Sequence, residues 1–351
     1  MVGIDVSERS IKIVQVSDGA TPVLETVCWS AIGHDMIKNG VVQDTEQMAG
    51  ALQMAMQKCT PAPVTGRRVV VSIPESQSFV RVLDLPIMSS QETDEAVQWA
   101  VRHHIPFDLE RVYIDWQPVG VISGLKKRQQ VLVGAAQRIV VDPLLEVLDT
   151  LKLQVEALEL EAQAIVRSLL PFQAQDVLGV LIVDMGAATT NIVYFDQGAM
   201  RFTTSIRSGG ENMTQQLARH LQVTPTVAAE KKALVGLSGG GEGETEVKAV
   251  LRAAALEIVK QIEQVVREVA VKGDSSGVRA IILSGGSANM PGLASVFSEV
   301  FPNIPVQLCN PLINVVNGGS GTSLTSSDAI HFSNAIGLAL REAVERGGDP
   351  V

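Results

Sequence analysis

Residues 180–195 read VLIVDMGAATTNIVYF, and this stretch decides the fold. Two runs rich in Val and Ile flank a turn that contains Asp184 and small residues, which is the pattern of a β-hairpin. Residues 2–16, VGIDVSERSIKIVQV, repeat the arrangement with Asp5 at the corresponding turn. The same unit at the start and near the middle of a 351-residue chain predicts a duplicated fold with two lobes.

Each hairpin is followed later in the chain by a further extended run. Residues 68–73, RVVVSI, precede Pro74 in the first half, and residues 280–283, AIIL, precede Gly285 and Gly286 in the second. A strand followed by a turn of this kind is typical of α/β folds. Aromatic residues are only 4% of a chain that is 46% hydrophobic, so we expect the aliphatic core of helix-on-sheet packing. The sequence therefore predicts an α/β fold.

A small α+β insertion is predicted between the two halves, at residues 79–153. Ser89 and Glu92 have the spacing of a capping box at the head of a helix. Two extended runs follow, and Asp142 with Pro143 predicts the start of a second helix.

Three further segments have helical patterns. Residues 246–272 have the length and charge pattern of a long amphipathic helix, and the glycine-rich run at 237–244 before it predicts a mobile loop. Helices expected at 157–169 and 328–341 carry several small residues, which allow two helices to cross at a short distance. Such a crossing fits a hinge between lobes and fits ordinary close packing equally well.

Composition excludes several classes of function. The formal net charge of −10 opposes binding to a phosphate backbone, so we expect no nucleic-acid partner. The apolar runs are shorter than the roughly 20 residues that a membrane-spanning helix needs, which predicts a soluble, cytoplasmic chain. The cysteines, Cys28, Cys59 and Cys309, are widely spaced and are expected to be ordinary thiols, and the five histidines predict no metal site.

The chemistry is expected at glycine-containing turns rather than at a Walker or Rossmann motif, since neither motif occurs in the sequence. Backbone N–H groups at a turn of small residues can approach phosphate oxygens, and a nearby carboxylate can hold hydrated Mg²⁺. Asp5 and Asp184 are the candidate Mg²⁺ residues, through water. The candidates for phosphate and metal binding at the two hairpins are Asp5, Ser7, Ser10, Lys12, Asp184, Gly186, Ala187, Thr189 and Thr190.

A second group of residues is predicted to complete a nucleoside pocket. Gly285, Gly286 and Ser287 follow the late strand and leave room for an adenosine against the backbone. Gly209 and Gly210, and Glu230 with Lys231 or Lys232, are candidates for the ribose and base. Any one of these turns alone is most often a plain turn. Their order and spacing along the chain are what favour ATP with Mg²⁺ as the ligand, and no residue is singled out as catalytic.

The set of turns resembles that of the actin, sugar-kinase and heat-shock-chaperone superfamily. Within it the chain resembles the PilM family of type IV pilus assembly proteins over nearly its full length. The stretches that carry this resemblance are RVLDLP at 81–86, IPFDLERVYIDWQ at 105–117, VLVGAAQ at 131–137, VDMGAATTNIV at 183–193 and NAIGLALR at 334–341.

The resemblance implies an actin-like, ribonuclease H-like duplicated fold with an insertion like that of the cell-division protein FtsA. Lobe 1 would comprise residues 1–78, 154–175 and 328–345, the insertion 79–153, and lobe 2 residues 176–327, with its outer subdomain at about 208–272. ATP would lie between the lobes. A groove near the insertion would take the N-terminal cytoplasmic peptide of PilN, an inner-membrane protein.

This implied role is that of an adaptor in the inner-membrane assembly platform, in contact with other platform proteins, and self-association stays open. The chain would be cytoplasmic and peripheral at the inner membrane through its partner. The final run REAVERGGDPV, at 341–351, predicts no amphipathic helix for direct membrane binding.

One departure from the family pattern concerns the first turn. The family usually carries glycine and serine where this chain has Ser7 and Glu8. A Cβ at position 7 crowds the turn, and the Glu8 carboxylate opposes phosphate. Asp5, Ser10 and Lys12 match the pattern, so we expect nucleotide binding to survive and hydrolysis to be slow or absent.

Two alternatives of other classes stay open at this point. A small-molecule kinase of the same superfamily needs a carboxylate base in a substrate pocket, and Asp84 or Asp115 would have to supply it from within the insertion. An FtsA-like protein that polymerises at the membrane shares the fold and the insertion.

Overall fold

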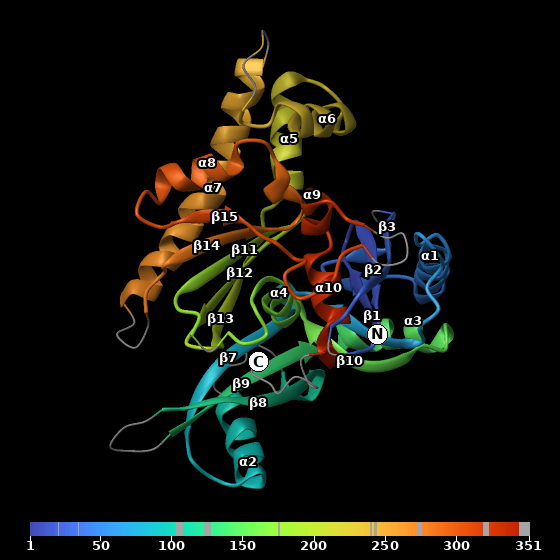
Figure 1. Ribbon diagram of the computed structural model, residues 1–351, viewed down its shortest axis with the longest axis vertical. Coiled ribbons are helices and arrows are strands. Elements are labelled where there is room, and N and C mark those ends of the chain that lie inside the picture. The colour runs from blue at the N-terminus through green and yellow to red at the C-terminus, as the bar shows by residue number, and fades with distance from the viewer. Residues whose placement is uncertain are drawn as a thin grey trace.

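The computed structural model describes residues 1–19, 21–33, 35–102, 108–122, 128–174, 176–238, 241, 244–271, 276–318 and 323–343. Two five-stranded sheets and a three-stranded sheet form the framework, together with one short two-stranded ribbon in the first half of the chain. In Figure 1 the second sheet lies at the upper left, the first sheet at the right and the three-stranded sheet at the bottom.

The first sheet has the strand order β10-β6-β1-β2-β3. A hairpin of β1 (Val2–Val6) and β2 (Ser10–Val16) forms its centre, β3 (Leu24–Ala31) continues it antiparallel, and β6 (Arg68–Ile73) and β10 (Gln154–Leu160) add in parallel. Alternate residues of β1 pack beneath α1 (Thr45–Gln57) and α3 (Arg138–Thr150), since Val2, Ile4 and Val6 share a buried cluster with those helices.

The second sheet repeats this topology, with the order β13-β12-β11-β14-β15. Its hairpin is β11 (Val180–Met185) and β12 (Thr190–Asp196), β13 (Ala199–Ile206) is antiparallel, and β14 (Ala280–Ser284) and β15 (Val306–Leu308) are parallel. The duplicated fold predicted from the two hairpins is therefore present. The helices on its outer face are α5 (Gly210–Leu221), α6 (Pro225–Val235), α7 (Glu244–Val271) and α8 (Leu293–Val300).

The insertion contains the three-stranded sheet, in the order β7-β9-β8. Its strands are β7 (Ser78–Pro86), β8 (Val112–Ile122) and β9 (Arg128–Gln137), and α2 (Ser90–Val101) packs on it. The Ser89–Glu92 capping box is present at the start of α2, as predicted. Arg201 Nη1 of β13 donates to Gln130 Oε1 of β9 at 2.5 Å, so the insertion also contacts the second sheet.

The expected helix start at Asp142 and Pro143 is wrong. Helix α3 begins at Arg138 after the N-cap residue Gln137, and Pro143 lies inside it. Val140, Val141 and Leu144 are buried on one face of this helix. Their burial outweighs the local starting signal of an aspartate followed by proline.

Two small-residue helices meet between the large sheets. α4 (Glu161–Leu169) covers the inner face of the second sheet, and α10 (Ser333–Ala339) covers that of the first. A Cβ on Gly337 would lie 1.8 Å from the carbonyl oxygen of Ala164, so the backbones of the two helices are in contact. The predicted close crossing is confirmed, and its use as a hinge stays a prediction. The predicted bounds are wrong, because residues 157–160 belong to β10 and the second predicted helix is divided into α9 (Ser326–Ile330) and α10.

A buried ion pair accompanies this crossing. Arg167 of α4 donates to Glu159 at 2.7 and 2.9 Å and to the Gly337 carbonyl at 2.8 Å. Both side chains are almost fully buried, and Glu159 also accepts from Arg341, so the buried carboxylate is compensated by two guanidinium groups.

The expectation that all three cysteines are thiols is wrong for two of them. Cys28 on β3 and Cys59, which follows α1, form a disulfide across 31 residues of sequence, while Cys309 is a buried free thiol. The sequence carries no signal for this pairing, because it depends on how closely α1 packs against the edge strand β3.

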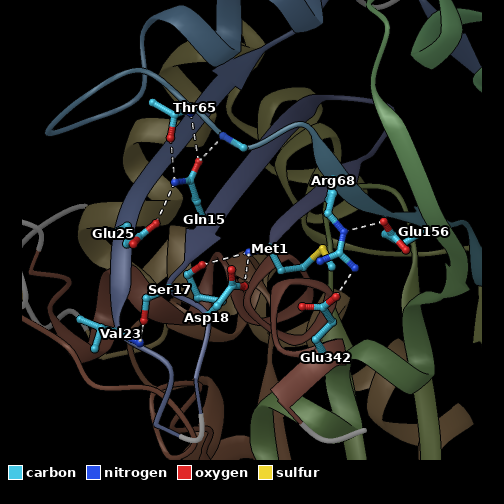
Figure 2. Close-up of polar contacts among 12 residues, drawn as sticks. Met1, Gln15, Ser17, Asp18, Val23, Glu25, Thr65, Arg68, Glu156 and Glu342 are labelled. Atoms are coloured by element: carbon cyan, nitrogen blue, oxygen red, sulfur yellow. Dashed lines mark hydrogen bonds and ion pairs between the residues drawn. The ribbon is translucent and has the colours of Figure 1, made fainter. Parts of the chain in front are cut away.

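Figure 2 shows the polar contacts at the end of the first sheet where β1 and β6 begin. Arg68 Nε donates to Glu156 of β10 at 2.6 Å, and its Nη2 pairs with Glu342 beyond α10. The Met1 ammonium donates to the Val16 carbonyl at 3.1 Å. These contacts fix the strands at one end of the sheet and leave the opposite ends of β1 and β6 for a site.

In the described ranges, no helix combines the length and the apolar character needed to span a bilayer. The long helix predicted at 246–272 is confirmed as α7 over its described part. Residues 239, 240, 242 and 243 of the predicted mobile loop at 237–244, and the final residues 344–351, lie outside the described residues. The division of the chain into lobes at the boundaries given above stays a prediction.

Candidate functional site

A cleft of about 1290 Å³ lies between the two large sheets. In each sheet the parallel strands end at one edge. The cleft forms where these two edges face each other, and it is lined by residues at the carboxyl ends of β1 and β11 and in the turn after β14. The lining includes Asp5, Ser7, Ser10, Lys12, Asp184, Gly186, Ala187, Thr189, Gly210, Gly285, Gly286 and Ser287, all predicted from the sequence.

Asp5 is held by donors from three different elements. The ammonium of Lys12 donates to its Oδ2 at 2.8 Å, while Ser72 Oγ and Asn334 Nδ2 donate to its Oδ1 at 3.1 and 2.8 Å. Only 3% of Asp5 is exposed. Burial opposes the charge on Lys12, but the ion pair with Asp5 outweighs it, and the pKa of Lys12 is raised. Ser72 and Asn334 were not predicted, since nothing local in the sequence relates them to Asp5.

The carboxyl groups of Asp184 and Glu161 have raised pKa values. Burial raises the pKa of Asp184 to about 6, against the opposing charge of Lys12. Burial, together with the charges of Asp5, Asp184 and Glu75, raises the pKa of Glu161 to about 8. Several carboxyl groups thus lie around the ammonium of Lys12, and repulsion among them disfavours full ionisation.

Glu161 was missed by the sequence analysis. It is the first residue of α4, directly after the parallel strand β10, and its Oε2 accepts from Asn191 Nδ2 at 2.7 Å. A signal was available, because a residue that follows a parallel strand lies at the same sheet edge as the turns after β1 and β6.

The second hairpin turn is built from backbone groups. Gly186 N donates to the Thr189 carbonyl at 2.9 Å, and Gly210 N and Ser287 Oγ donate to the Gly186 carbonyl at 3.0 and 2.9 Å. A Cβ on Gly209 would lie 2.6 Å from the Ala187 carbonyl oxygen, so only glycine fits at the start of α5. The turn is therefore closed by contacts that a larger residue would break.

The Gly285–Gly286 pair also lies in tight surroundings. Gly285 has a φ of +82°, and a Cβ there would lie 2.8 Å from Asp184 Oδ1. A Cβ on Gly286 would meet the ring of His331 at 2.7 Å. Burial and the charge of Lys12 lower the pKa of His331, so this ring is neutral at pH 7. Both glycines line the cleft beside Asp184, and neither position has room for a Cβ.

The remaining predicted residues differ in placement. Thr190 is buried, and its hydroxyl donates to the Ser208 carbonyl at 2.8 Å, which fixes β12 against the segment before α5. Glu230 and Lys231 are exposed on α6. Lys232 lines the cleft and donates to the Gly210 carbonyl at 2.6 Å, and burial lowers its pKa. Of the two lysines considered for the base and ribose, Lys232 is therefore the one at the cleft.

A contact between the two halves of the cleft involves residues that the sequence analysis did not single out. Arg9, in the turn between β1 and β2, donates from Nε and Nη2 to the two carboxylate oxygens of Glu211, at 2.9 and 2.8 Å. Glu211 is in the first turn of α5, and its N–H donates to the Ala187 carbonyl at 2.8 Å. The first hairpin is thus tied to the segment that closes the second.

The carboxyl groups fit a hydrated divalent cation better than a directly bound one. Within the described ranges, no group of three or more His, Cys, Asp or Glu side chains is placed to hold a metal ion. Asp184 has a raised pKa and lies by the backbone turn, so a nearby cation would favour its ionised form. Asn334 Oδ1, buried beside Asp5, accepts no hydrogen bond. These groups suit binding through water, as magnesium prefers.

Comparison with protein families shows which family the chain belongs to. The sequence model of the family described as type IV pilus assembly protein PilM matches residues 3–343. The chain belongs to the PilM family. Family membership confirms the resemblance drawn from the motifs at 81–86, 131–137 and 183–193, and it places the chain among proteins of type IV pilus assembly.

Curated relatives of this PilM-family chain include cell-division proteins called FtsA. The FtsA of Pseudomonas aeruginosa is 32% identical over 178 residues, which are 45% of this chain and 42% of that protein. The FtsA of Streptococcus pneumoniae is 22% identical over 336 residues, 85% of this chain and 73% of that protein. The first match thus spans less than half of its relative.

Solved structures agree on the fold. A structure titled PilM-PilN type IV pilus biogenesis complex has a TM-score of 0.85 at 22% identity, covering 97% of this chain and 98% of that one. MreB5 of Spiroplasma citri bound to AMPPNP has a TM-score of 0.55 at 12% identity, covering 99% and 98%. The predicted actin-like α/β fold is confirmed.

Proposed function

We propose that this chain is an ATP-binding adaptor of the type IV pilus inner-membrane assembly platform. It binds the N-terminal cytoplasmic peptide of a PilN-like membrane protein, and ATP with Mg²⁺ in the cleft sets the angle between the lobes. The observation that carries the nucleotide site is the pair of facing turns, one beside Asp5 and the other beside Asp184, that line one cleft between duplicated sheets.

The cleft supports ATP as the ligand in three ways. Its volume of about 1290 Å³ exceeds that of most small-ligand pockets, so an extended triphosphate nucleotide fits. Lys12 and the turn at Gly186 would hold phosphates, and the surface at Gly285 and Gly286 would take adenosine. Magnesium, when bound, neutralises phosphate charge among carboxylates whose pKa values are otherwise raised.

The raised pKa of Glu161 supports slow or absent hydrolysis as part of this proposal. Glu161 is a carboxyl group in the cleft, but a pKa of about 8 keeps it mostly protonated at pH 7. A protonated carboxyl cannot accept a proton from an attacking water. The chain would therefore act through the bound state of the nucleotide rather than through turnover.

A PilN-like partner is supported by the similarity in fold to a PilM-PilN complex. Because no described helix can span a bilayer, membrane association would come from that partner. Contacts with other platform proteins and self-association belong to the same proposal.

The kinase alternative is weaker. Asp84 lies on β7 and accepts from Gln130 Nε2 at 2.9 Å, and Asp115 lies on β8 and accepts from the Trp116 backbone at 2.9 Å. Both belong to the insertion, whereas the cleft lies between the two large sheets. The FtsA-like alternative is supported by the curated relatives, and liposome pelleting without any partner would favour it.

The decisive experiment measures binding of a synthetic N-terminal PilN-like peptide to the full chain, with and without Mg-ATP. We expect binding, with an affinity that changes on addition of Mg-ATP. A scrambled peptide of the same composition is the control. Equal binding of both peptides would contradict specific recognition of a PilN-like partner. An affinity that does not change with Mg-ATP would contradict the proposal that the nucleotide regulates peptide binding.

The nucleotide site has its own test. Mg-ATP should raise the melting temperature of the unaltered chain, and Asp184→Ala should abolish that shift. Asp149→Ala serves as a matched control, because Asp149 is an exposed residue of α3 that does not line the cleft. An unchanged shift in Asp184→Ala would reject the assigned role of Asp184.

A further inference from the structure

The ion pair of Arg9 and Glu211 occupies an unusual position. Arg9 belongs to the turn of the first hairpin, and Glu211 belongs to the helix start that closes over the turn of the second. Their two hydrogen bonds, at 2.9 and 2.8 Å, have the parallel fork geometry of a guanidinium with a carboxylate. Both residues line the cleft, and each side chain is about a quarter exposed, at 29% and 26%. The pair thus spans the space that separates the two turns.

The other cationic side chains that line the described cleft already have partners of different kinds. Lys12 is paired with the buried Asp5 at 2.8 Å, and Lys232 donates to the backbone carbonyl of Gly210 at 2.6 Å. Releasing Lys12 would leave a buried carboxylate unpaired, which is costly. Releasing Arg9 from Glu211 leaves a carboxylate that water can solvate, which costs much less. Arg9 is therefore more easily transferred to an entering anion than Lys12, and unlike Lys232 it offers the fork geometry of a guanidinium.

A phosphate group offers the same fork geometry as a carboxylate, with more negative charge. We propose that Arg9 is a phosphate-binding residue of this cleft and that Glu211 competes with the terminal phosphate of the nucleotide for its guanidinium. The proposal rests on the proposed nucleotide site, and it adds a residue and a regulatory step to it. Without nucleotide, the pair ties the first hairpin to α5, and with a triphosphate bound, Arg9 leaves Glu211.

The movement of Arg9 from Glu211 to a phosphate would connect phosphate binding to the contact between the two lobes. Glu211 is fixed through its backbone to Ala187 at 2.8 Å, and the Arg9 carbonyl accepts from the Ile32 backbone at 3.1 Å, so each partner is anchored in its own half of the molecule. Breaking the ion pair removes a side-chain tie between these halves. A phosphate that binds Arg9 and the Gly186 turn together would replace that tie with its own.

The test compares the affinities of the full chain for Mg-ATP and Mg-ADP in Arg9→Ala, Arg9→Lys and Glu211→Gln. Arg9→Ala should weaken Mg-ATP binding about tenfold, because a charge-assisted pair with phosphate is lost, and should weaken Mg-ADP less. Arg9→Lys should restore part of the affinity. Glu211→Gln should strengthen Mg-ATP binding several-fold, because the competitor is gone. The double variant should behave as Arg9→Ala does.

The sign of these effects separates the proposal from a purely structural role. If the pair only ties the lobes together, Arg9→Ala and Glu211→Gln remove the same interaction and change the affinity in the same direction, which would overturn the proposal. Arg252→Ala removes an ion pair with Glu299 on the outer side of the second half and should leave both affinities unchanged. Thermal melting of each variant confirms that it is folded.

Measurements on the unaltered chain distinguish failure of the nucleotide site from failure of the role proposed for Arg9. Failure of the unaltered chain to bind Mg-ATP would reject the nucleotide site and the role of Arg9 together. Normal Mg-ATP binding with equal-sign responses in the two variants would reject the role of Arg9 alone.

Discussion

The two hairpin turns have the same backbone topology and different chemistry. The second turn, between β11 and β12, is closed by backbone hydrogen bonds at Gly186 and needs glycine at 209 and 285. The first turn, between β1 and β2, carries the charged side chains of Glu8 and Arg9. The two sheets therefore share a strand order, while one turn has small residues that allow close backbone approach and the other carries charges.

The two aspartates show the same contrast. Asp5 has a hydrogen-bonding donor for each oxygen and is almost fully buried. Asp184 is partly exposed in the cleft and has a pKa raised to about 6. Equivalent positions in the duplicated sheets thus have different surroundings: Asp5 is buried and paired with Lys12, and Asp184 lies at the cleft with a raised pKa.

The largest expected effect comes from removing the first of these carboxylates. Asp5→Ala leaves Lys12, Ser72 and Asn334 without their acceptor and should lower the free energy of unfolding by about 3 kcal/mol. Asp184→Asn should leave the stability of the unliganded chain unchanged or slightly raised, because a disfavoured charge is removed. Urea unfolding of both variants measures the difference. Equal destabilisation by the two substitutions would break the comparison.

The pH dependence of stability tests the acidic cluster. The folded pKa of Glu161, about 8, lies above its ordinary value of 4.5, so the folded chain binds more protons than the unfolded chain between these values. The free energy of unfolding of the unliganded chain should therefore fall as pH rises from about 4.5 to 8, by up to a few kcal/mol. Asp184 contributes in the same direction between its ordinary value of 3.8 and about 6.

Glu161→Gln is the matched variant for this measurement. It keeps the shape of the side chain and removes its titration, so the decrease in stability between pH 6 and 8 should become smaller. Urea midpoints at several pH values give the slope. A slope equal to that of the unaltered chain would show that Glu161 does not titrate in this range.

Substitution of a glycine that packs against the second turn should be tolerated less well than substitution of a charged residue in the first turn. A Cβ at position 285 would meet the Met185 carbonyl at 2.6 Å and Asp184 Oδ1 at 2.8 Å, and φ is +82°. Gly285→Ala should cost about 1–3 kcal/mol in stability and weaken Mg-ATP binding. Gly19→Ala, at a positive φ with no atom near the added methyl, is a control for backbone strain alone. Similar losses in the two variants would assign the effect to strain rather than to the crowded cleft.

Much of this architecture could be predicted from the sequence. The hairpins at 2–16 and 180–195 have a strong local pattern, and so does the capping box at Ser89. The family motifs located the same turns. Asp5, Lys12, Gly186 and Gly285 all line the cleft. They lie at or beside turns, and the turns after β1, β11 and β14 are at the edges where the parallel strands of each sheet end.

The rest depended on contacts between distant segments. Asn334 reaches Asp5 across 329 residues, and Glu211 reaches Arg9 across 202, with no local pattern that relates either pair. The Cys28–Cys59 disulfide depends on the packing of α1 against β3. The true start of α3 depended on burial of its apolar face rather than on the aspartate and proline within it. Side-chain partners of this kind require the folded arrangement.

The smallest expected effect concerns Glu8, the acidic residue of the first turn. Glu8 lines the cleft beside Ser7, and its carboxylate opposes an entering phosphate. Glu8→Ser should strengthen Mg-ATP binding by a factor of about two to five, since a partly exposed like charge is worth less than about 1 kcal/mol. Raising the salt concentration should reduce the difference between the variant and the unaltered chain, because screening weakens the repulsion. A weaker affinity in Glu8→Ser would mean that this carboxylate helps to bind the nucleotide, and the first turn would then use both of its charges for the ligand.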